Sequence, residues 1–165
     1  MGCVEIFKVT VRGTDLKFSA AHFLIGENVK EGIHGHNYEV EVSVWGALNA
    51  DYMVVDFRKL RDLVKEICKS IDHKVIIPKN NGCLKVSTNG DKVEVRTETS
   101  TYVFPRDDVA FLPIEASTAE LLAKYLCDKI IENLLEHHDN IYGVEVKIYE
   151  HAGSCATYTR KIRGE

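Results

Sequence analysis

The sequence contains no run of 18 consecutive apolar residues, so we expect no transmembrane helix. Glu5 and Lys8 interrupt the apolar stretch near the N-terminus, and we therefore expect no signal peptide. We find no internal repeat and no low-complexity segment. The chain has 165 residues, of which 45% are apolar and 28% charged, an ordinary globular composition. That length is sufficient to bury one core, so we expect a single domain over residues 1–165.

The chain also lacks an excess of positive charge. Its net charge is -4 at pH 7, and its isoelectric point is near 6.0. A protein with this charge has no global field that attracts nucleic acid or anionic membranes, so we expect neither as a partner. A phosphorylated small molecule stays possible, because a local cluster of cations can bind it whatever the net charge.

Cysteine is present, but its spacing does not suggest pairing. The five cysteines are an odd number, lie far apart in the sequence and form no Cys-x-x-Cys motif. This pattern is typical of a reduced chain rather than of a disulfide framework. We therefore expect a cytoplasmic protein.

Apolar residues at alternate positions predict antiparallel strands, solvated on one face, in the first part of the chain. Residues 4–11 and 16–23 are each expected to form a strand, with a turn between them. Residues 34–45 alternate strongly, with apolar side chains on one face and polar ones on the other. Residues 23–33 show no clear period and contain two glycines, so we expect a loop there.

Two helices follow from apolar residues spaced three and four apart. The first is expected to begin after Asp56, a suitable N-cap, and to continue to Ile71. The second is expected to begin at a capping box formed by Ser117 and Glu120 and to extend to residue 138.

The last two strands are expected at residues 144–150 and 155–162. Between the helices, residues 79–113 contain an Asn-Gly dipeptide that predicts a tight β-hairpin turn, and residues 101–104 are a candidate third strand. This segment has too few apolar residues for a core of its own, so we expect a surface β insertion. The order of elements predicts an α+β fold with both helices on one face of an antiparallel sheet.

Strand phase places three histidines on one side of this sheet. Alternate residues of a strand share a face, so His34 and His36 lie on the interior face of their strand and His22 on the interior face of its own. Residues two apart are roughly 6–7 Å apart along a strand, close enough for both side chains to reach one ion. Three neutral nitrogens suit Zn²⁺ and leave a fourth position for water or substrate. A hydrogen-bonded core role is the competing interpretation.

Three other polar residues each allow two interpretations. Glu150 is in phase with the apolar residues of the strand 144–150. It either marks the point where that strand reaches solvent or binds a ligand with two adjacent N–H donors. Asp72 and His73 close the first helix, where the helix dipole favours a histidine. Alternatively the two act as an acid–base pair in which the carboxylate orients the imidazole.

Six short motifs occur along the chain in an order that carries a resemblance. They are Phe18-Ser19-Ala20-Ala21-His22, His34-Gly35-His36-Asn37-Tyr38, Val55-Asp56-Phe57, Asp72-His73, Thr118-Ala119-Glu120 and Glu150. Together they resemble the 6-pyruvoyl-tetrahydropterin synthase / 6-carboxy-tetrahydropterin synthase family over the whole chain except residues 79–113. The resemblance implies a T-fold, in which a four-stranded antiparallel sheet carries two helices. It also implies homo-oligomers, trimers or hexamers, with active sites between subunits.

The resemblance also implies roles for individual residues and a substrate, 7,8-dihydroneopterin triphosphate. The implied assignments are zinc binding for His22, His34 and His36, pterin binding for Glu150 and Thr118, and a proton relay for Asp72 and His73. Zinc would polarise the side-chain oxygens of the substrate. Lys30, Lys74 and Arg160 are candidates to bind its phosphates.

The chain departs from the family pattern at one position. Family members that make 6-pyruvoyl or 6-carboxy products use a cysteine as general base, a few residues before His-Gly-His. Residues 26–33 of this chain contain no cysteine. The pattern Glu31-x-x-His-Gly-His instead resembles the subfamily that cleaves the side chain to give 6-hydroxymethyl-7,8-dihydropterin, a precursor of folate or methanopterin. Glu31 would then take the proton of the 2′-hydroxyl in a retro-aldol reaction. A solvated loop residue is the alternative for Glu31.

Three other functions stay open at this point. The first is 6-pyruvoyl or 6-carboxy product formation with a different base. The second is a non-catalytic pterin-binding T-fold subunit, which would not need three aligned histidines. The third is metal storage, which would leave Glu150 and Thr118 without a role.

Overall fold

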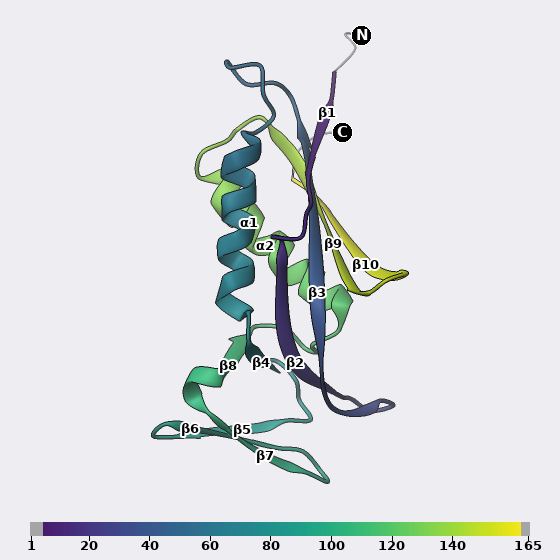
Figure 1. The fold of residues 1–165 in the computed structure, drawn as a ribbon, viewed down its shortest axis with the longest axis vertical. Coiled ribbons are helices and arrows are strands. Elements are labelled where there is room, and N and C mark those ends of the chain that lie inside the picture. Colours follow the sequence, from purple (N-terminus) through teal and green to yellow (C-terminus); the bar gives the residue numbers. More distant parts are fainter. Residues whose placement is uncertain (1–4, 163–165) are drawn as a thin grey trace.

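A computed structural model describes residues 5–162 of the chain. The main sheet has seven strands: β1 (Phe7–Val11), β2 (Lys17–Ile25), β3 (Lys30–Gly46), β4 (Lys74–Pro78), β8 (Val109–Leu112), β9 (Ile141–His151) and β10 (Ser154–Lys161). They are arranged in the order β10-β9-β3-β2-β4-β8, and β1 also pairs with β3. Both helices lie on one face of this sheet, as Figure 1 shows. The expected α+β class is confirmed.

The long strand β3 organises the sheet. It pairs antiparallel with β1 and β2 along one edge and with β9 along the other. Its alternate residues Tyr38, Val40 and Val42 are fully buried beneath the helices, because they occupy the interior face that the alternation predicts. Its start at Lys30 overturns the loop expected at residues 23–33, where only residues 26–29 form a turn. A hairpin of two strands satisfies the backbone groups that a loop would leave to water.

The other antiparallel strands agree with the expectation within a few residues. The first expected strand began at residue 4, which lies outside the described residues, and β1 begins at Phe7. β9 and β10 form the second hairpin of the sheet and cover the expected ranges 144–150 and 155–162 closely.

The two helices pack their apolar stripes onto the sheet. α1 (Phe57–Ile71) begins after Asp56, whose side chain accepts a hydrogen bond from the Arg58 N–H, as expected for an N-cap. α2 (Ala119–Leu135) begins after Thr118 instead, and it ends before the expected residue 138. The capping box at Ser117 was therefore wrong. The hydroxyl of Ser117 is buried and donates to the Phe23 carbonyl of β2, so it is not available to cap the helix.

Two short parallel strands were missed. β4 pairs with β2, and β8 pairs with β4. Each has only four or five residues without alternation, and such short apolar runs have no period that distinguishes a buried strand from a helix segment. They widen the antiparallel part of the sheet, β1, β2, β3, β9 and β10, on the side that faces the insertion.

The insertion forms a separate three-stranded antiparallel sheet. Its strands are β5 (Lys85–Asn89), β6 (Lys92–Arg96) and β7 (Thr101–Pro105), and a 3-10 turn at Arg106–Asp108 leads into β8. The hairpin at Asn89-Gly90 and the third strand are both confirmed. Figure 1 shows this small sheet below the end of β2, where it closes one end of the molecule. Among residues 5–162, no helix is long and apolar enough to cross a membrane.

Candidate metal centre and pocket

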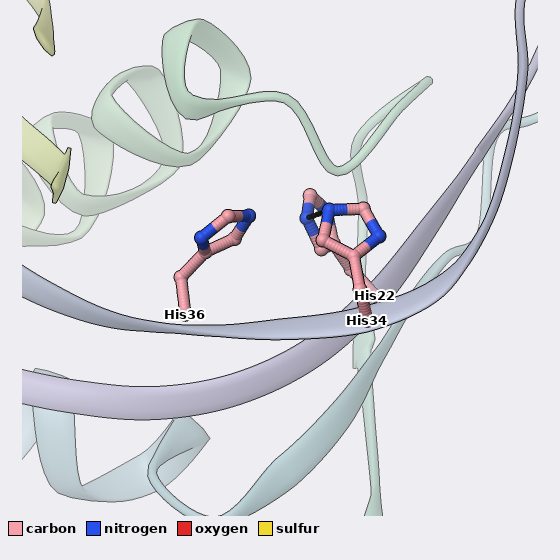
Figure 2. A group of neighbouring side chains, drawn as sticks. All are labelled: His22, His34 and His36. Carbon is pink, nitrogen blue, oxygen red and sulfur yellow. Dashed lines mark hydrogen bonds between the residues drawn. The ribbon is translucent and has the colours of Figure 1, made fainter.

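The three histidines converge as strand phase predicts. His22 on β2 and His34 on β3 are direct partners across the antiparallel pair, and His36 follows two residues along β3. One ligand atom from each lies within 4.8 Å of the others. Figure 2 shows the three rings pointing toward one another from the two strands, on the side where α2 begins.

Main-chain carbonyls fix which nitrogen of His22 and His34 faces the cluster. The Nδ1 of His22 lies 2.8 Å from the Ser117 carbonyl oxygen, and the Nδ1 of His34 lies 2.7 Å from that of Gly32. A carbonyl only accepts, so both Nδ1 atoms carry the proton and donate it. The Nε2 of each neutral ring is then left with a free lone pair. Outer hydrogen bonds of this kind orient histidines that bind metals.

The two free lone pairs face each other at short range. The Nε2 atoms of His22 and His34 are 3.0 Å apart. His22 is 1% exposed, and burial lowers its pKa, which disfavours a proton on the ring. Two lone pairs at this distance repel, and a shared cation removes the repulsion. Nitrogens bound to one tetrahedral ion are about 3.4 Å apart, so small side-chain rotations bring all three into its range. The residues therefore fit a zinc ion.

The histidines line a cavity of about 470 Å³. Its lining residues are His22, Leu24, Glu31, His34, His36, Thr118, Ala119, Glu120, Ile148, Glu150, His151, Ser154, Cys155 and Ala156. This volume falls within the usual range for small-molecule sites. Strands β2, β3, β9 and β10 and the start of α2 all contribute to its wall.

Both expected pterin-binding residues line this cavity. Glu150 ends the inward face of β9 and places its Oε1 3.7 Å from the His36 Nε2. It is half-buried, so the strand has not yet reached open solvent at this position. Thr118, the N-cap of α2, and Glu120 in the first turn of that helix also line the cavity.

A β-bulge brings Glu31 to the same cavity. His22 pairs with His34, but Leu24 pairs with Glu31, so two residues of β3 oppose one of β2 at this point. The extra residue reverses the phase of β3, and Glu31 thereby shares the face of His34. Its Oε1 lies 3.9 Å from the His34 Nε2. Without the bulge, the odd-numbered Glu31 would face the other side of the sheet.

Asp72 and His73 lie away from this cavity. Asp72 accepts from the Ser19 N–H at 2.7 Å, which lowers its pKa, and its other oxygen lies 2.9 Å from the His73 Nδ1. The two side chains are therefore in contact. His73 has a positive φ of 58° and a side chain that is 83% exposed. It borders a separate hollow with Asn37 and Lys74, on the other face of β2 and β3.

Two residues of the site were not anticipated. Ser117 is fully buried; its hydroxyl donates to the Phe23 carbonyl, and its own carbonyl holds His22. Tyr38 is fully buried with its hydroxyl 3.4 Å from the His22 Nε2, and burial raises its pKa. Tyr38 shares the strand phase of His34 and His36, which is a signal in the sequence. Ser117 gives no such signal, because its contacts depend on how α2 meets the sheet.

The three candidate phosphate-binding cations do not line the cavity. Arg160 forms an ion pair with Asp128 at 2.6 Å. Lys74 donates to the Asp107 carbonyl, and Lys30 donates to Thr99. Within residues 5–162, the wall of the cavity contains three glutamates and no lysine or arginine.

The α+β fold, the three converging histidines and the carboxylate-rich cavity together indicate a class of protein. That class is the T-fold proteins, here with a candidate metal centre. A sequence profile of the 6-pyruvoyl tetrahydropterin synthase family matches residues 11–161, and the chain belongs to this family, whose members are enzymes of pterin biosynthesis. The expected family and T-fold are thus confirmed.

Two known relatives match this chain over nearly its full length, and a third matches a shorter segment. A putative 6-carboxy-5,6,7,8-tetrahydropterin synthase of Methanocaldococcus jannaschii is 37% identical over 149 residues, 89% of this chain and 91% of that protein. The crystal structure of the Plasmodium vivax 6-pyruvoyl tetrahydropterin synthase superposes with a TM-score of 0.90 at 30% identity, covering 96% of this chain and 100% of that one. A dihydroneopterin monophosphate aldolase of Pyrococcus furiosus is 40% identical over 57 residues, 34% of this chain and 48% of that protein.

A histidine substitution tests the metal centre. We expect His34→Ala to lose bound zinc, because two nitrogens hold the ion far more weakly than three. The measurement is zinc content by elemental analysis after dialysis. His151→Ala is the control, since His151 lines the same cavity outside the cluster and its loss should leave zinc unchanged. Full zinc retention by His34→Ala contradicts the assignment.

Proposed function

We propose that the protein is a zinc-dependent lyase that cleaves the side chain of 7,8-dihydroneopterin triphosphate to give 6-hydroxymethyl-7,8-dihydropterin. The observation that carries the proposal is Glu31, which the bulge places 3.9 Å from His34 and inside the cavity. Two further structures of the Plasmodium vivax relative carry alanine or cysteine in place of a catalytic glutamate, which supports a glutamate as the reacting base in this fold.

The proposed reaction assigns Glu31 as the base. Its carboxylate takes the proton of the 2′-hydroxyl, the C2′–O bond becomes a carbonyl, and the C1′–C2′ bond breaks. The electron pair passes into the conjugated pterin ring and returns to C1′ when that carbon is protonated. Zinc on His22, His34 and His36 would supply a Lewis acid for the side-chain oxygens. The released fragment is an aldehyde that retains the phosphates.

The pterin ring is proposed to bind at the other end of the cavity. Glu150 can accept hydrogen bonds from the 2-amino group and the N3–H together, since a carboxylate offers two acceptor oxygens to two adjacent donors. Its position near His36 would set the distance between ring and metal. Thr118 is proposed to contact the same ring from the start of α2.

The charge of the cavity favours a second candidate substrate, dihydroneopterin monophosphate. Three glutamates without a lysine or arginine in the described lining repel a triphosphate more strongly than a monophosphate. The Pyrococcus furiosus relative is an aldolase for the monophosphate. Cations supplied by a neighbouring copy would relieve the repulsion and restore the triphosphate as substrate.

Asp72 and His73 are proposed to act on the cavity of a neighbouring copy within a homotrimer or hexamer. They lie on the other face of β2 and β3, and the exposed ring of His73 has no contact with the cavity of its own chain. In such an assembly His73 would deliver the proton to C1′, with Asp72 orienting its ring.

The four described cysteines are free, which is consistent with the cytoplasm as the proposed location.

A glutamate substitution with product identification tests the reaction. Incubated with either substrate, the wild-type protein should release 6-hydroxymethyl-7,8-dihydropterin, detected by chromatography and mass spectrometry. Glu31→Ala should keep its zinc and lose turnover by ~100-fold or more, because proton transfer by a positioned base contributes 10²–10⁴-fold. Glu27→Ala is the matched control, since Glu27 lies in the adjoining turn outside the cavity.

The other outcomes identify the competing functions. A 6-pyruvoyl or 6-carboxy product would replace the cleavage reaction, and unchanged turnover of Glu31→Ala would remove that residue from the mechanism. Pterin binding without any product would indicate a non-catalytic subunit.

Mixed oligomers test whether His73 acts across subunits. Glu31→Ala and His73→Ala proteins, each inactive alone, should regain part of the activity when they are unfolded together and reassembled. Some cavities of the mixture then contain an intact Glu31 beside an intact His73 from the next copy. The same treatment of each variant alone is the control. A mixture that stays as inactive as its components contradicts an intersubunit relay.

A further inference from the structure

The insertion packs directly against the strand segment that leads to Glu31. Its inner face contributes Val93 and Val95, which are fully buried, and the aromatic rings of Tyr102 and Phe104. These side chains pack with Phe23 and Ile25 of β2 and with Ile77 of β4 in a cluster separate from the main core. The insertion therefore has no independent core and shares one with the end of the β2–β3 hairpin.

Phe23 links this cluster to the bulge. It is the single β2 residue between the pairs His22–His34 and Leu24–Glu31, and it is 2% exposed. Its ring stacks on Tyr102 with centroids 5.0 Å apart and an interplanar angle of 8°. Its carbonyl accepts from the Ser117 hydroxyl at 3.1 Å. The residue opposite the bulge is thus held from both sides.

Two polar contacts join the insertion segment to the rest of the hairpin. The side-chain amide of Asn81 donates to the Ile25 carbonyl at 2.9 Å. The amine of Lys30 donates to the hydroxyl of Thr99, in the turn between β6 and β7. Lys30 precedes Glu31 in β3, and Ile25 is the cross-strand partner of Lys30. Both contacts therefore act on the two strands within one residue of the Leu24–Glu31 pair.

Glu31 itself is held weakly. Its side chain is 54% exposed, and the polar contact found for it is the 3.9 Å approach to His34. The position of its carboxylate therefore depends on the backbone of residues 24–31, and that backbone is supported on its outer face by the insertion. A catalytic group works best when surrounding contacts hold it, because a misplacement of about 1 Å can cost ~100-fold in rate.

We propose that the three-stranded insertion is a platform that positions Glu31 for catalysis, with Tyr102 and Thr99 as its positioning residues. Tyr102 supports the hairpin through the stack on Phe23, and Thr99 anchors Lys30. This inference rests on the proposed role of Glu31 as base. It assigns a function to residues 79–113, which carry no residue of the cavity.

Substitutions on the two faces of β7 provide a matched test. Tyr102→Ala removes the stack and should lower kcat by ~10- to 100-fold while KM and zinc content stay near the wild-type values. Tyr102→Phe keeps the ring and should restore kcat. Val103→Ala is the control, since Val103 is 56% exposed on the other face of the same strand and its loss should leave kcat unchanged.

Hydrogen exchange gives a readout that does not depend on the reaction. In Tyr102→Ala, the amides of residues 24–31 should exchange faster than in the wild type, while those of β9 stay protected. If Glu31→Ala proves fully active, the proposed function fails and exchange alone decides whether the insertion holds the hairpin. If Glu31→Ala is inactive but Tyr102→Ala has wild-type kcat, the proposed function stands and the platform is overturned.

A milder variant covers the case in which Tyr102→Ala does not fold. Thr99→Val changes an exposed turn residue and removes the acceptor of the Lys30 amine. It should lower kcat several-fold at unchanged zinc content and melting temperature. A wild-type kcat for Thr99→Val contradicts the inference. If Glu31→Ala has shown that Glu31 is not the base, unchanged hydrogen exchange at residues 24–31 of Thr99→Val contradicts it instead.

Discussion

His22 and His34 face each other across the β2–β3 pair with their Nε2 atoms 3.0 Å apart, while both Nδ1 atoms donate to main-chain carbonyls. The register of these strands sets the distance, and the carbonyls of Ser117 and Gly32 set the tautomer. The rest of the site depends on this arrangement, because it creates two converging lone pairs in a buried place where a proton is disfavoured. His36, two residues further along β3, adds the third nitrogen. The same sheet that builds the core thus also presents a candidate metal centre at the edge of that core.

The same hairpin has two faces with different tasks. Its inner face carries the histidines and, through the bulge, Glu31. Its outer face is covered by apolar and aromatic residues of the insertion, of which Tyr102 stacks on Phe23. A bulge gives up one ladder position and is prone to deform, so support on its outer face has a clear mechanical value. In the proposed function, strand geometry places Glu31, and the packing of the insertion supports the backbone that carries it.

The sequence predicted those parts of the protein that periodicity controls. Strand phase placed the three histidines and Glu150 on the inward faces of their strands but left their roles open, and apolar spacing predicted both helices. Strand phase failed at residues 23–33, because the bulge breaks the alternation there and the sequence of the segment resembles a loop. The short strands β4 and β8 have no period of their own. Ser117 was assigned to a capping box that its sequence neighbours favour, whereas tertiary contacts with His22 and Phe23 use the same residue differently. Contacts between distant segments are what single-sequence reasoning does not provide.

β2 and β3 are proposed to form a zinc site beside a catalytic glutamate. A crystal structure of the zinc-loaded protein with diffraction data on both sides of the zinc absorption edge tests it most directly. We predict an anomalous peak about 2.1 Å from one nitrogen each of His22, His34 and His36, with the Glu31 carboxylate directed into the same cavity. A zinc peak at another position, or none at these histidines in protein that has full zinc content, would contradict it.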